Sequence, residues 1–509
     1  MKISLISLYP DIATIGLRIL SASLKKEGHS VQIVFLRNEF EKKYENNIIN
    51  ELVGQIKETD LIGVSLTTNF FENAIQITQG IKKNLNVPIV WGGIHPTIRP
   101  KECLDYADMV CLGEGEETLV ELVQKMEAGQ DLYDIKGMWF KDKGRIITNT
   151  LRPLKEDLNS IAFPDYNYRN HYLHIKNDIK KIDLTILKIY LQKRYSTMAS
   201  RGCPFGCTYC CNNTINQMYP NHRMIRKRNW DNIIEEINEA RKLLPFIEYI
   251  YFEDDAFFFY TTDEIKDFCV RYNKYVGLPL SIGGGTPANL TAEKLKALND
   301  VGLRFIRMGI QSWSERSRKL YKRNFSNAEI LETIQLLNKF KDTVIPSYDI
   351  ILDNPWETDQ ELIESLMILT KIPLPFVLTL FSLTFFPGTE LYERAKIEGL
   401  IKNDLKDVYR KRYQIAGMRK TYLNKLFILF QKYVIRGNTI STRTMFLLTN
   451  EKFRRLYLSQ FLYILLNIWL KVLQIRYYMF KGFKSVIRGD ASTIIEFLNR
   501  KLRIYDFRI

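Results

Sequence analysis

Four cysteines fall within nine residues near the middle of the chain, and their spacing is the strongest chemical signal in the sequence. Cys203, Cys207 and Cys210 follow a C-x-x-x-C-x-x-C pattern on one glycine-containing loop, and Cys211 comes directly after them. Three thiolates spaced in this way can hold a cubane [4Fe-4S] cluster and leave one iron without a protein ligand. That open iron can bind the amino and carboxylate groups of a small molecule and pass it an electron.

Structural zinc is the main alternative for these cysteines. Zinc needs a fourth ligand, commonly from a second paired set, and no such set is found in the sequence. Cys211 could complete the number, but adjacent cysteines fit a tetrahedral site poorly. The close spacing is also wrong for a disulfide framework, and the first ten residues are too short an apolar run for a secretory signal. We therefore expect reduced thiols and a cytoplasmic protein.

The cysteine loop follows the first strand of a predicted strand–helix series. Short apolar runs at residues 195–199, 249–252, 281–283, 305–308, 347–352 and 377–381 alternate with helical patterns such as 229–244 and 328–340. Six such repeats predict an incomplete, TIM-like (β/α)6 barrel, with its chemistry at the carboxyl ends of the strands.

A second α/β region precedes this barrel. Residues 3–8, 31–35, 61–65, 89–91 and 109–112 are predicted as buried parallel strands, with helices at 15–26, 48–57 and 74–85. The pattern predicts a doubly wound, Rossmann-like sheet, whose ligands bind outside the carboxyl ends of its strands. The loops at that edge are 67–69, 92–97 and 113–116. Their paired glycines suit either a close approach to a ligand or an ordinary tight turn.

These patterns divide the chain into a Rossmann-like domain at 1–150, a linker at 151–190, the barrel at 191–399 and a basic helical region at 400–509. The charge is unevenly distributed among them. Residues 401–509 contain 23 Lys and Arg against 6 Asp and Glu, while the whole chain carries +16. The first 400 residues are therefore nearly neutral, and the basic charge belongs to the C-terminal region.

The cysteine loop, with Tyr209 before its last cysteine, resembles the signature of the radical S-adenosylmethionine (SAM) superfamily. The acidic stretch at 252–255, the fourth-strand stretch at 307–312 and the turn at 386–389 resemble further motifs of that family, in the same order. One departure lies at 353–358, where Trp356 stands at a position that is often glycine in relatives. The resemblance implies cluster ligands at Cys203, Cys207 and Cys210 and SAM contacts at Tyr209, Asp254, Asp255, Gln311 and Ser312.

The first 150 residues resemble the cobalamin-binding domain that precedes this barrel in a large subgroup of radical enzymes. The stretches 15–17, 63–65, 92–97 and 113–116 carry the resemblance. A D-x-H-x-x-G loop, which supplies a histidine to cobalt in other cobalamin domains, is not found, so we expect cobalamin without a protein imidazole on the metal. A sheet that has lost its corrinoid is the alternative. The resemblance implies cobalamin contacts at Ser65, Thr67, Gly92, Gly93, His95, Gly113 and Glu114.

Together the two resemblances imply a class B methyltransferase-like enzyme. It would cleave SAM to a 5′-deoxyadenosyl radical and, with cobalamin, methylate an unactivated carbon of a small-molecule or lipid-like intermediate. An external donor such as flavodoxin or ferredoxin would supply the electron. Two alternatives stay open: a radical cyclisation or rearrangement with the same cofactors, and a corrinoid-binding protein without catalysis. No general base is identifiable, since the cofactors would perform the difficult steps.

The basic region contains a long apolar helix candidate at residues 453–483, with a polar stripe formed by Gln460, Asn467, Lys471, Gln474 and Lys481. Lys471 disfavours a membrane-spanning helix. We favour a helical cap on the barrel with its charges in water. Peripheral contact with an anionic membrane is a second interpretation. Nucleic-acid binding is disfavoured, because no recognisable RNA-binding module is present.

Overall fold

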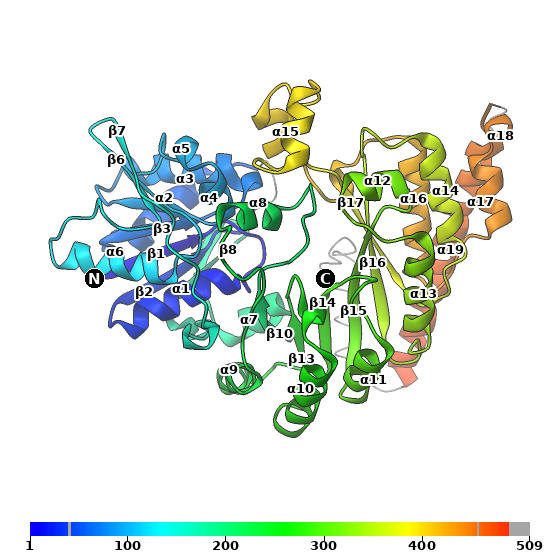
Figure 1. Ribbon diagram of the computed structural model, residues 1–509, viewed down its shortest axis with the longest axis horizontal. Helices are drawn as coiled ribbons and strands as arrows, with labels where there is room; N and C mark the ends of the chain where they lie inside the picture. Colours follow the sequence, from blue (N-terminus) through cyan, green and yellow to red (C-terminus); the bar gives the residue numbers. More distant parts are fainter. Residues whose placement is uncertain (39–41, 456–457, 488–509) are drawn as a thin grey trace.

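Two sheets of mainly parallel strands organise the chain, which the computed structural model describes over residues 1–38, 42–455 and 458–487 (Figure 1). The first sheet contains the predicted strands in the order β5-β4-β3-β1-β2, all parallel. Between β1 and β3 the winding of the chain changes direction, so the loops at their carboxyl ends diverge and leave a crevice. The bounds are β1 (Lys2–Ser7), β2 (Ser30–Phe35), β3 (Leu61–Ser65), β4 (Ile89–Gly92) and β5 (Met109–Cys111).

Helices cover both faces of this sheet, as its strands require because their side chains are apolar on both sides. α1 (Ile15–Lys26) and α6 (Glu116–Glu127) pack on one face, while α2 (Asn46–Ile56) and α3 (Phe71–Lys82) pack on the other. The α/β, Rossmann-like architecture predicted for this part of the chain is confirmed.

The segment predicted as a linker, 151–190, is different in the structure. It contains β8 (His171–Ile175) and β9 (Asp178–Lys181), which extend the first sheet beyond β2, and α7 (Leu184–Leu191). The hairpin β6 (Met138–Asp142) and β7 (Arg145–Thr148) extends the opposite edge. Strand β8 was not predicted because only His171 and Leu173 of its five residues are buried, which leaves a weak apolar pattern.

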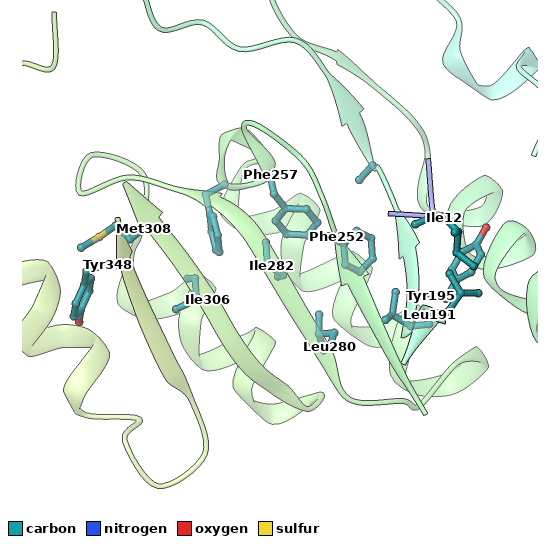
Figure 2. Packing of buried hydrophobic residues seen from close by; sticks show 14 of the residues in the cluster. Ile12, Leu191, Tyr195, Phe252, Phe257, Leu280, Ile282, Ile306, Met308 and Tyr348 are labelled. Atoms are coloured by element: carbon teal, nitrogen blue, oxygen red, sulfur yellow. The ribbon is translucent and has the colours of Figure 1, made fainter. Parts of the chain in front are cut away.

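The second sheet is the predicted partial barrel, with six parallel strands in chain order. Apolar side chains such as Phe252, Ile282 and Ile306 form a buried core behind the strands (Figure 2). The alternate positions carry polar side chains, including Tyr251 and Arg307, as the period of two requires. The strands are β10 (Arg194–Thr197), β13 (Tyr249–Phe252), β14 (Leu280–Gly285), β15 (Leu303–Gln311), β16 (Ile345–Leu352) and β17 (Val377–Ser382).

The layer of helices on this sheet begins with α9 (Trp230–Leu243), α10 (Thr262–Tyr275), α11 (Ala292–Asp300), α13 (Asn327–Asn338) and α14 (Asp359–Leu369). The C-terminal region completes it, because α16 (Tyr422–Val434) packs on β17 and Gln431 donates to the Leu378 carbonyl oxygen at 2.7 Å. α17 (Thr442–Thr449), α18 (Glu451–Arg455) and α19 (Leu458–Ile487) follow. In the part of the chain that the structure describes, no helix combines the length and apolar character needed to cross a bilayer.

Candidate functional site

The predicted cysteine loop lies between β11 (Ser200–Arg201) and α8 (Cys211–Met218), beyond the carboxyl end of β10. Gly202 enters the loop with a φ of 94°, and a Cβ there would lie 2.1 Å from the Met224 carbonyl oxygen, so only glycine fits. Cys207 is buried, while Cys203 and Cys210 are partly exposed. Burial, with the nearby Asp255 and the other two thiols, raises the pKa of Cys203 to about 12. Metal binding therefore has to displace this proton.

The centre of the loop is fixed by contacts to distant parts of the chain. The Thr208 hydroxyl donates to the Leu320 carbonyl oxygen at 2.8 Å, and the Thr208 carbonyl accepts from the Leu391 amide at 3.0 Å. Tyr209 packs edge-on against Tyr321, with ring centroids 5.1 Å apart. These contacts tie the cysteine loop to the segments that follow β15 and β17.

Arg323 is a buried cation beside the cysteine loop that the sequence patterns did not reveal. It is 6% exposed and lies between α12 (Glu315–Leu320) and α13. One Nη donates to Cys207 Sγ at 3.7 Å and the other to the Gly309 carbonyl oxygen at 2.6 Å. The guanidinium also packs on the rings of Phe205 and Phe325. A guanidinium held in this way stabilises negative charge on the adjacent sulfur. The sequence around Arg323 gave no indication of this contact, because Cys207 is 116 residues away along the chain.

We expect Arg323→Met to lower the midpoint potential of a cluster bound in this loop, because a positive charge and a hydrogen bond beside Cys207 are lost. The shift should be on the order of 60 mV, the equivalent of a tenfold change for one electron. Potentiometric titration followed by EPR measures it. Arg323→Lys, which keeps the charge, should recover part of the potential, and an unchanged potential in Arg323→Met would contradict this role.

Asp254 and Asp255, two of the three acids that follow β13, occupy different environments. The Asp254 carboxylate is buried and accepts hydrogen bonds from the Ala199 amide (2.9 Å), the Ser200 amide (2.6 Å) and the Ser200 hydroxyl (2.6 Å). Burial raises the pKa of Asp254 to about 6, although these hydrogen bonds oppose the rise. The Asp255 side chain reaches solvent, yet the surrounding protein desolvates its carboxyl and raises its pKa, while a hydrogen bond with Asn212 opposes the rise. Its charge contributes to the raised pKa of Cys203. Asp254 therefore fixes the backbone that leads into the cysteine loop, whereas Asp255 acts on the thiols through its charge.

The different environments of Asp254 and Asp255 predict that substitution of the first affects stability and substitution of the second affects SAM binding. Asp254→Ala should lower the free energy of unfolding by about 2–4 kcal/mol, because three donors lose a buried acceptor. Asp255→Ala should change it by less than about 0.5 kcal/mol, as expected for an exposed side chain, and should instead weaken SAM binding. Urea denaturation and equilibrium binding of SAM measure the two effects. Equal destabilisation by both substitutions would contradict the assignment.

Gln311 and Ser312, predicted on the fourth strand, also have different surroundings. Gln311 ends β15 in the left-handed region, with a φ of 72°. Its amide lies over Gly309, where a Cβ would be 2.5 Å from Gln311 Nε2 and 3.3 Å from the Arg323 guanidinium. The Ser312 hydroxyl is buried and donates to Glu357 at 2.6 Å. Gln311 thus lies beside the cysteine loop, whereas Ser312 holds the turn that leads into α14.

Trp356, the departure from the family pattern, points to the side of α15 (Glu390–Ile397). Its indole N–H donates to Glu398 at 2.6 Å, and the Arg394 guanidinium lies 4.5 Å from the ring centroid. The bulk of this side chain is therefore placed against α15.

The turn at 386–389 joins α8 to the first domain. Gly388 has a φ of 78°, its carbonyl oxygen accepts from Thr214 at 2.9 Å, and a Cβ would lie 2.6 Å from Ile98. Asn213 of α8 donates to Glu390, the first residue after the turn, at 3.0 Å. The turn therefore positions the helix that follows the cysteines.

A cavity of about 280 Å³ lies at the carboxyl edge of the first sheet, where the loops after β1 and β3 diverge. Five of the predicted cobalamin contacts line it, namely Ser65, Gly92, Gly93, Gly113 and Glu114. Leucine and valine side chains, among them Leu5, Val64 and Leu119, supply an apolar wall. The barrel adds a wall that the sequence patterns did not predict, formed by Thr197, Met198, Arg201, Arg228 and Glu236.

Two predicted cobalamin contacts, Thr67 and His95, lie outside this lining. His95 belongs to α4 (Ile94–Ile98) and is 1% exposed. Its ring packs against Phe71 (4.8 Å between centroids) and Tyr409 (5.2 Å), and burial lowers its pKa to about 3. The helical turn after Gly93 rotates the histidine away from the sheet edge and into the core. The structure thus places His95 in the packing of the domain and not beside the cavity.

Ion pairs connect the cavity to the cysteine loop. Glu114 binds Arg226 in a bidentate pair (2.6 and 2.9 Å) and Arg201 at 3.0 Å, and Glu116 accepts from Arg201 at 2.6 Å. Burial opposes ionisation of Glu114, but the hydrogen bond from Arg226 and the charge of Arg201 hold its pKa below the usual value. Arg201 precedes Cys203 by two residues, so the two sites share a wall.

The donor set of the loop suits an iron–sulfur cluster. A cubane binds its cysteines through separate irons, so three thiols on one loop can hold it without converging on a single ion. The Arg323 guanidinium, which donates to Cys207 Sγ, places a positive charge beside one of these sulfurs.

Comparison with known families gives two matches. Residues 1–123 match the B12 binding domain, and residues 198–368 match the Radical SAM superfamily. The first match includes β1, β3 and β4, whose residues line the cavity, and the second includes the cysteine loop and the strands β13 to β16.

Three known proteins illustrate the similarity. An uncharacterized methyltransferase of Pyrococcus horikoshii is 28% identical, over 75% of this chain and 78% of that protein. An anaerobic magnesium-protoporphyrin IX monomethyl ester cyclase of Cereibacter sphaeroides is 26% identical over 54% of this chain, which spans only 43% of the cyclase. The structure of the radical SAM methyltransferase TsrM from Kitasatospora setae has a TM-score of 0.64 and 16% identity, covering 78% of this chain and 76% of that one, which shows a shared fold.

Proposed function

We propose that this chain, which carries a B12 binding domain in front of a radical SAM domain, transfers a methyl group from cobalamin to an unactivated carbon of a small molecule. The observation that supports this most is the shared wall between the two sites. Arg201 lines the cavity, binds Glu114 and Glu116 of the first domain, and lies two residues before the first cysteine. A methyl group and a substrate radical have to meet, and this arrangement brings the two cofactor sites together.

A radical SAM domain uses a [4Fe-4S] cluster and SAM, and a B12 binding domain carries cobalamin; these are the cofactors of this chain. When bound, they supply radical formation and methyl transfer, so no protein base is needed. The chain's own residues bind and orient them. We assign Cys203, Cys207 and Cys210 to the cluster, Asp255 and Gln311 to SAM, and Ser65, Gly92, Gly93, Gly113 and Glu114 to cobalamin.

Further assignments concern the cellular compartment, the electron carrier and the substrate class. We propose a cytoplasmic enzyme, because a reducing compartment keeps the three thiols free, with an electron carrier such as flavodoxin or ferredoxin as its partner. Tetrapyrroles are the first substrate class to test, since the cyclase relative is named for a magnesium-protoporphyrin ester. That relative also favours the second candidate function, a radical cyclisation with the same cofactors.

Methyl-labelled SAM distinguishes these functions. After anaerobic reconstitution with iron, sulfide and cobalamin, we expect the CD3 group of SAM to appear on the bound cobalamin even without substrate, because charging of the cobalt requires only SAM and reductant. Mass spectrometry of the extracted corrinoid measures the label. Formation of 5′-deoxyadenosine without label on cobalamin would contradict methyl transfer and support cyclisation. Absence of both products would indicate a corrinoid-binding protein without catalysis.

A further inference from the structure

Helix α19 presents a continuous apolar face to solvent. Seven large side chains follow one another at steps of three, three, one, three, one and three residues, which places them on one side of a helix. Each is between 39% and 61% exposed: Leu458, Phe461, Ile464, Leu465, Ile468, Trp469 and Val472. We call these residues the α19 stripe. At 1.5 Å per residue it is about 21 Å long.

The opposite side of α19 accounts for its attachment to the protein. Ser459 and Leu470 are buried, and the Leu466 carbonyl oxygen accepts from Tyr433 of α16 at 2.8 Å. Tyr463 packs against Tyr422, with ring centroids 6.5 Å apart. Between the docked side and the stripe lies a polar edge with Gln460, Asn467 and Lys471. Packing on the barrel thus explains one face of the helix and leaves the stripe unexplained, because soluble proteins rarely expose so large a contiguous apolar patch.

The charge around the stripe indicates what it contacts. Residues 420–472 contain nine Lys and Arg and one acidic residue, and α19 itself contains no Asp or Glu. Six of these basic side chains are exposed and form no ion pair within the described part of the chain: Lys420, Lys425, Lys432, Arg443, Lys452 and Lys471. An apolar face in a segment of the chain with uncompensated cations matches the surface of an anionic bilayer, where acyl chains and negative headgroups meet.

We propose that α19 docks the enzyme on anionic membranes, with the stripe inserted at the headgroup boundary and the exposed cations of residues 420–472 drawn to the lipid phosphates. A protein partner would be an alternative occupant, but it would need a large acidic surface with an apolar centre. This inference goes beyond the proposed function, because the stripe is separate from the cofactor sites and its binding requires no catalysis.

Vesicle flotation of the full chain tests the proposal. We expect binding to vesicles of phosphatidylcholine with phosphatidylglycerol, weaker binding at high salt and little binding to phosphatidylcholine alone. The double variant Phe461→Ser/Ile468→Ser should reduce binding at least tenfold. Both side chains are more than half exposed, so the fold should be retained, which circular dichroism checks. Val270→Ser/Ile397→Ser, which removes two exposed apolar side chains on other helices, should bind like the wild type.

Three outcomes would overturn the proposal. Equal flotation of the wild type and the α19 variant would show that membrane binding does not depend on the stripe. No flotation of the wild type, with a dimer that the same variant dissociates, would make a second copy the occupant. Flotation only after removal of residues 488–509 would indicate that this segment, and not a membrane, covers the stripe in the full chain. None of these results bears on methyl transfer, so failure here leaves the proposed function intact.

Discussion

Cys207→Ala is expected to abolish the iron–sulfur cluster and, with it, all cleavage of SAM. Cys207 is the central cysteine of the triplet and the one whose sulfur accepts from Arg323. With only two thiolates left on the loop, the cubane loses one of its three protein ligands. Iron and sulfide content, visible absorbance and EPR of the anaerobically reconstituted protein measure the cluster, and 5′-deoxyadenosine formation measures cleavage. We expect both to fall to background.

Cys211→Ala provides the matched control. Cys211 is adjacent to Cys210 but begins α8, outside the spacing of the triplet. The structure therefore predicts that this variant keeps the cluster and its SAM cleavage. A cluster that survives Cys207→Ala, or one that disappears only with Cys211→Ala, would show that the ligands are wrongly assigned.

The second large effect is expected from filling the cavity at a single glycine. Gly16 is the second residue of α1, lines the cavity, and would have no atom within 4 Å of an added Cβ. Gly16→Leu therefore extends into the space assigned to cobalamin without a clash inside the protein. We expect cobalamin affinity to fall at least tenfold, about 1.4 kcal/mol. The fold should not suffer, because leucine favours a helix over glycine by roughly 1 kcal/mol.

Gly54→Leu is the control for this experiment. Gly54 is also a helical glycine, in α2, with no atom within 4 Å of an added Cβ, and it is exposed away from the cavity. Both variants add the same side chain to a helix, so only the position differs. Absorbance of bound cobalamin after gel filtration measures occupancy. Equal occupancy in Gly16→Leu and in the wild type would place cobalamin elsewhere.

Much of the architecture could be predicted because the central strands of both sheets are parallel and covered by helices. Strands that are buried on both faces are short apolar runs. Such runs can be recognised in the sequence without knowledge of the segments that pack on them. β9 shows the limit: three of its four residues are charged, and it lies at the sheet edge. Its pairing with β8 depends on register, which no local pattern records.

Site residues could be predicted where their role depends on spacing along the chain. They could not be predicted where the role depends on the direction of a side chain on a helix or on contacts between distant segments. The cysteine triplet is a local spacing, so its residues could be named. His95 could not be excluded from the cavity, because one turn of α4 decides which way the ring points. The sequence likewise cannot separate Asp254, which holds the backbone, from Asp255, which acts on the thiols through its charge. Arg323 depends on folding across 116 residues and has no motif of its own.

We place the cluster site and the cobalamin site next to each other across the Arg201 wall. EPR of protein loaded with both the reduced cluster and cob(II)alamin measures whether they are close, since two close paramagnets broaden and split each other's signals. The structure predicts a coupled spectrum in the wild type that reverts to the uncoupled cluster signal in Gly16→Leu. A wild-type spectrum equal to the sum of the two separate signals would show that the two sites are not neighbours.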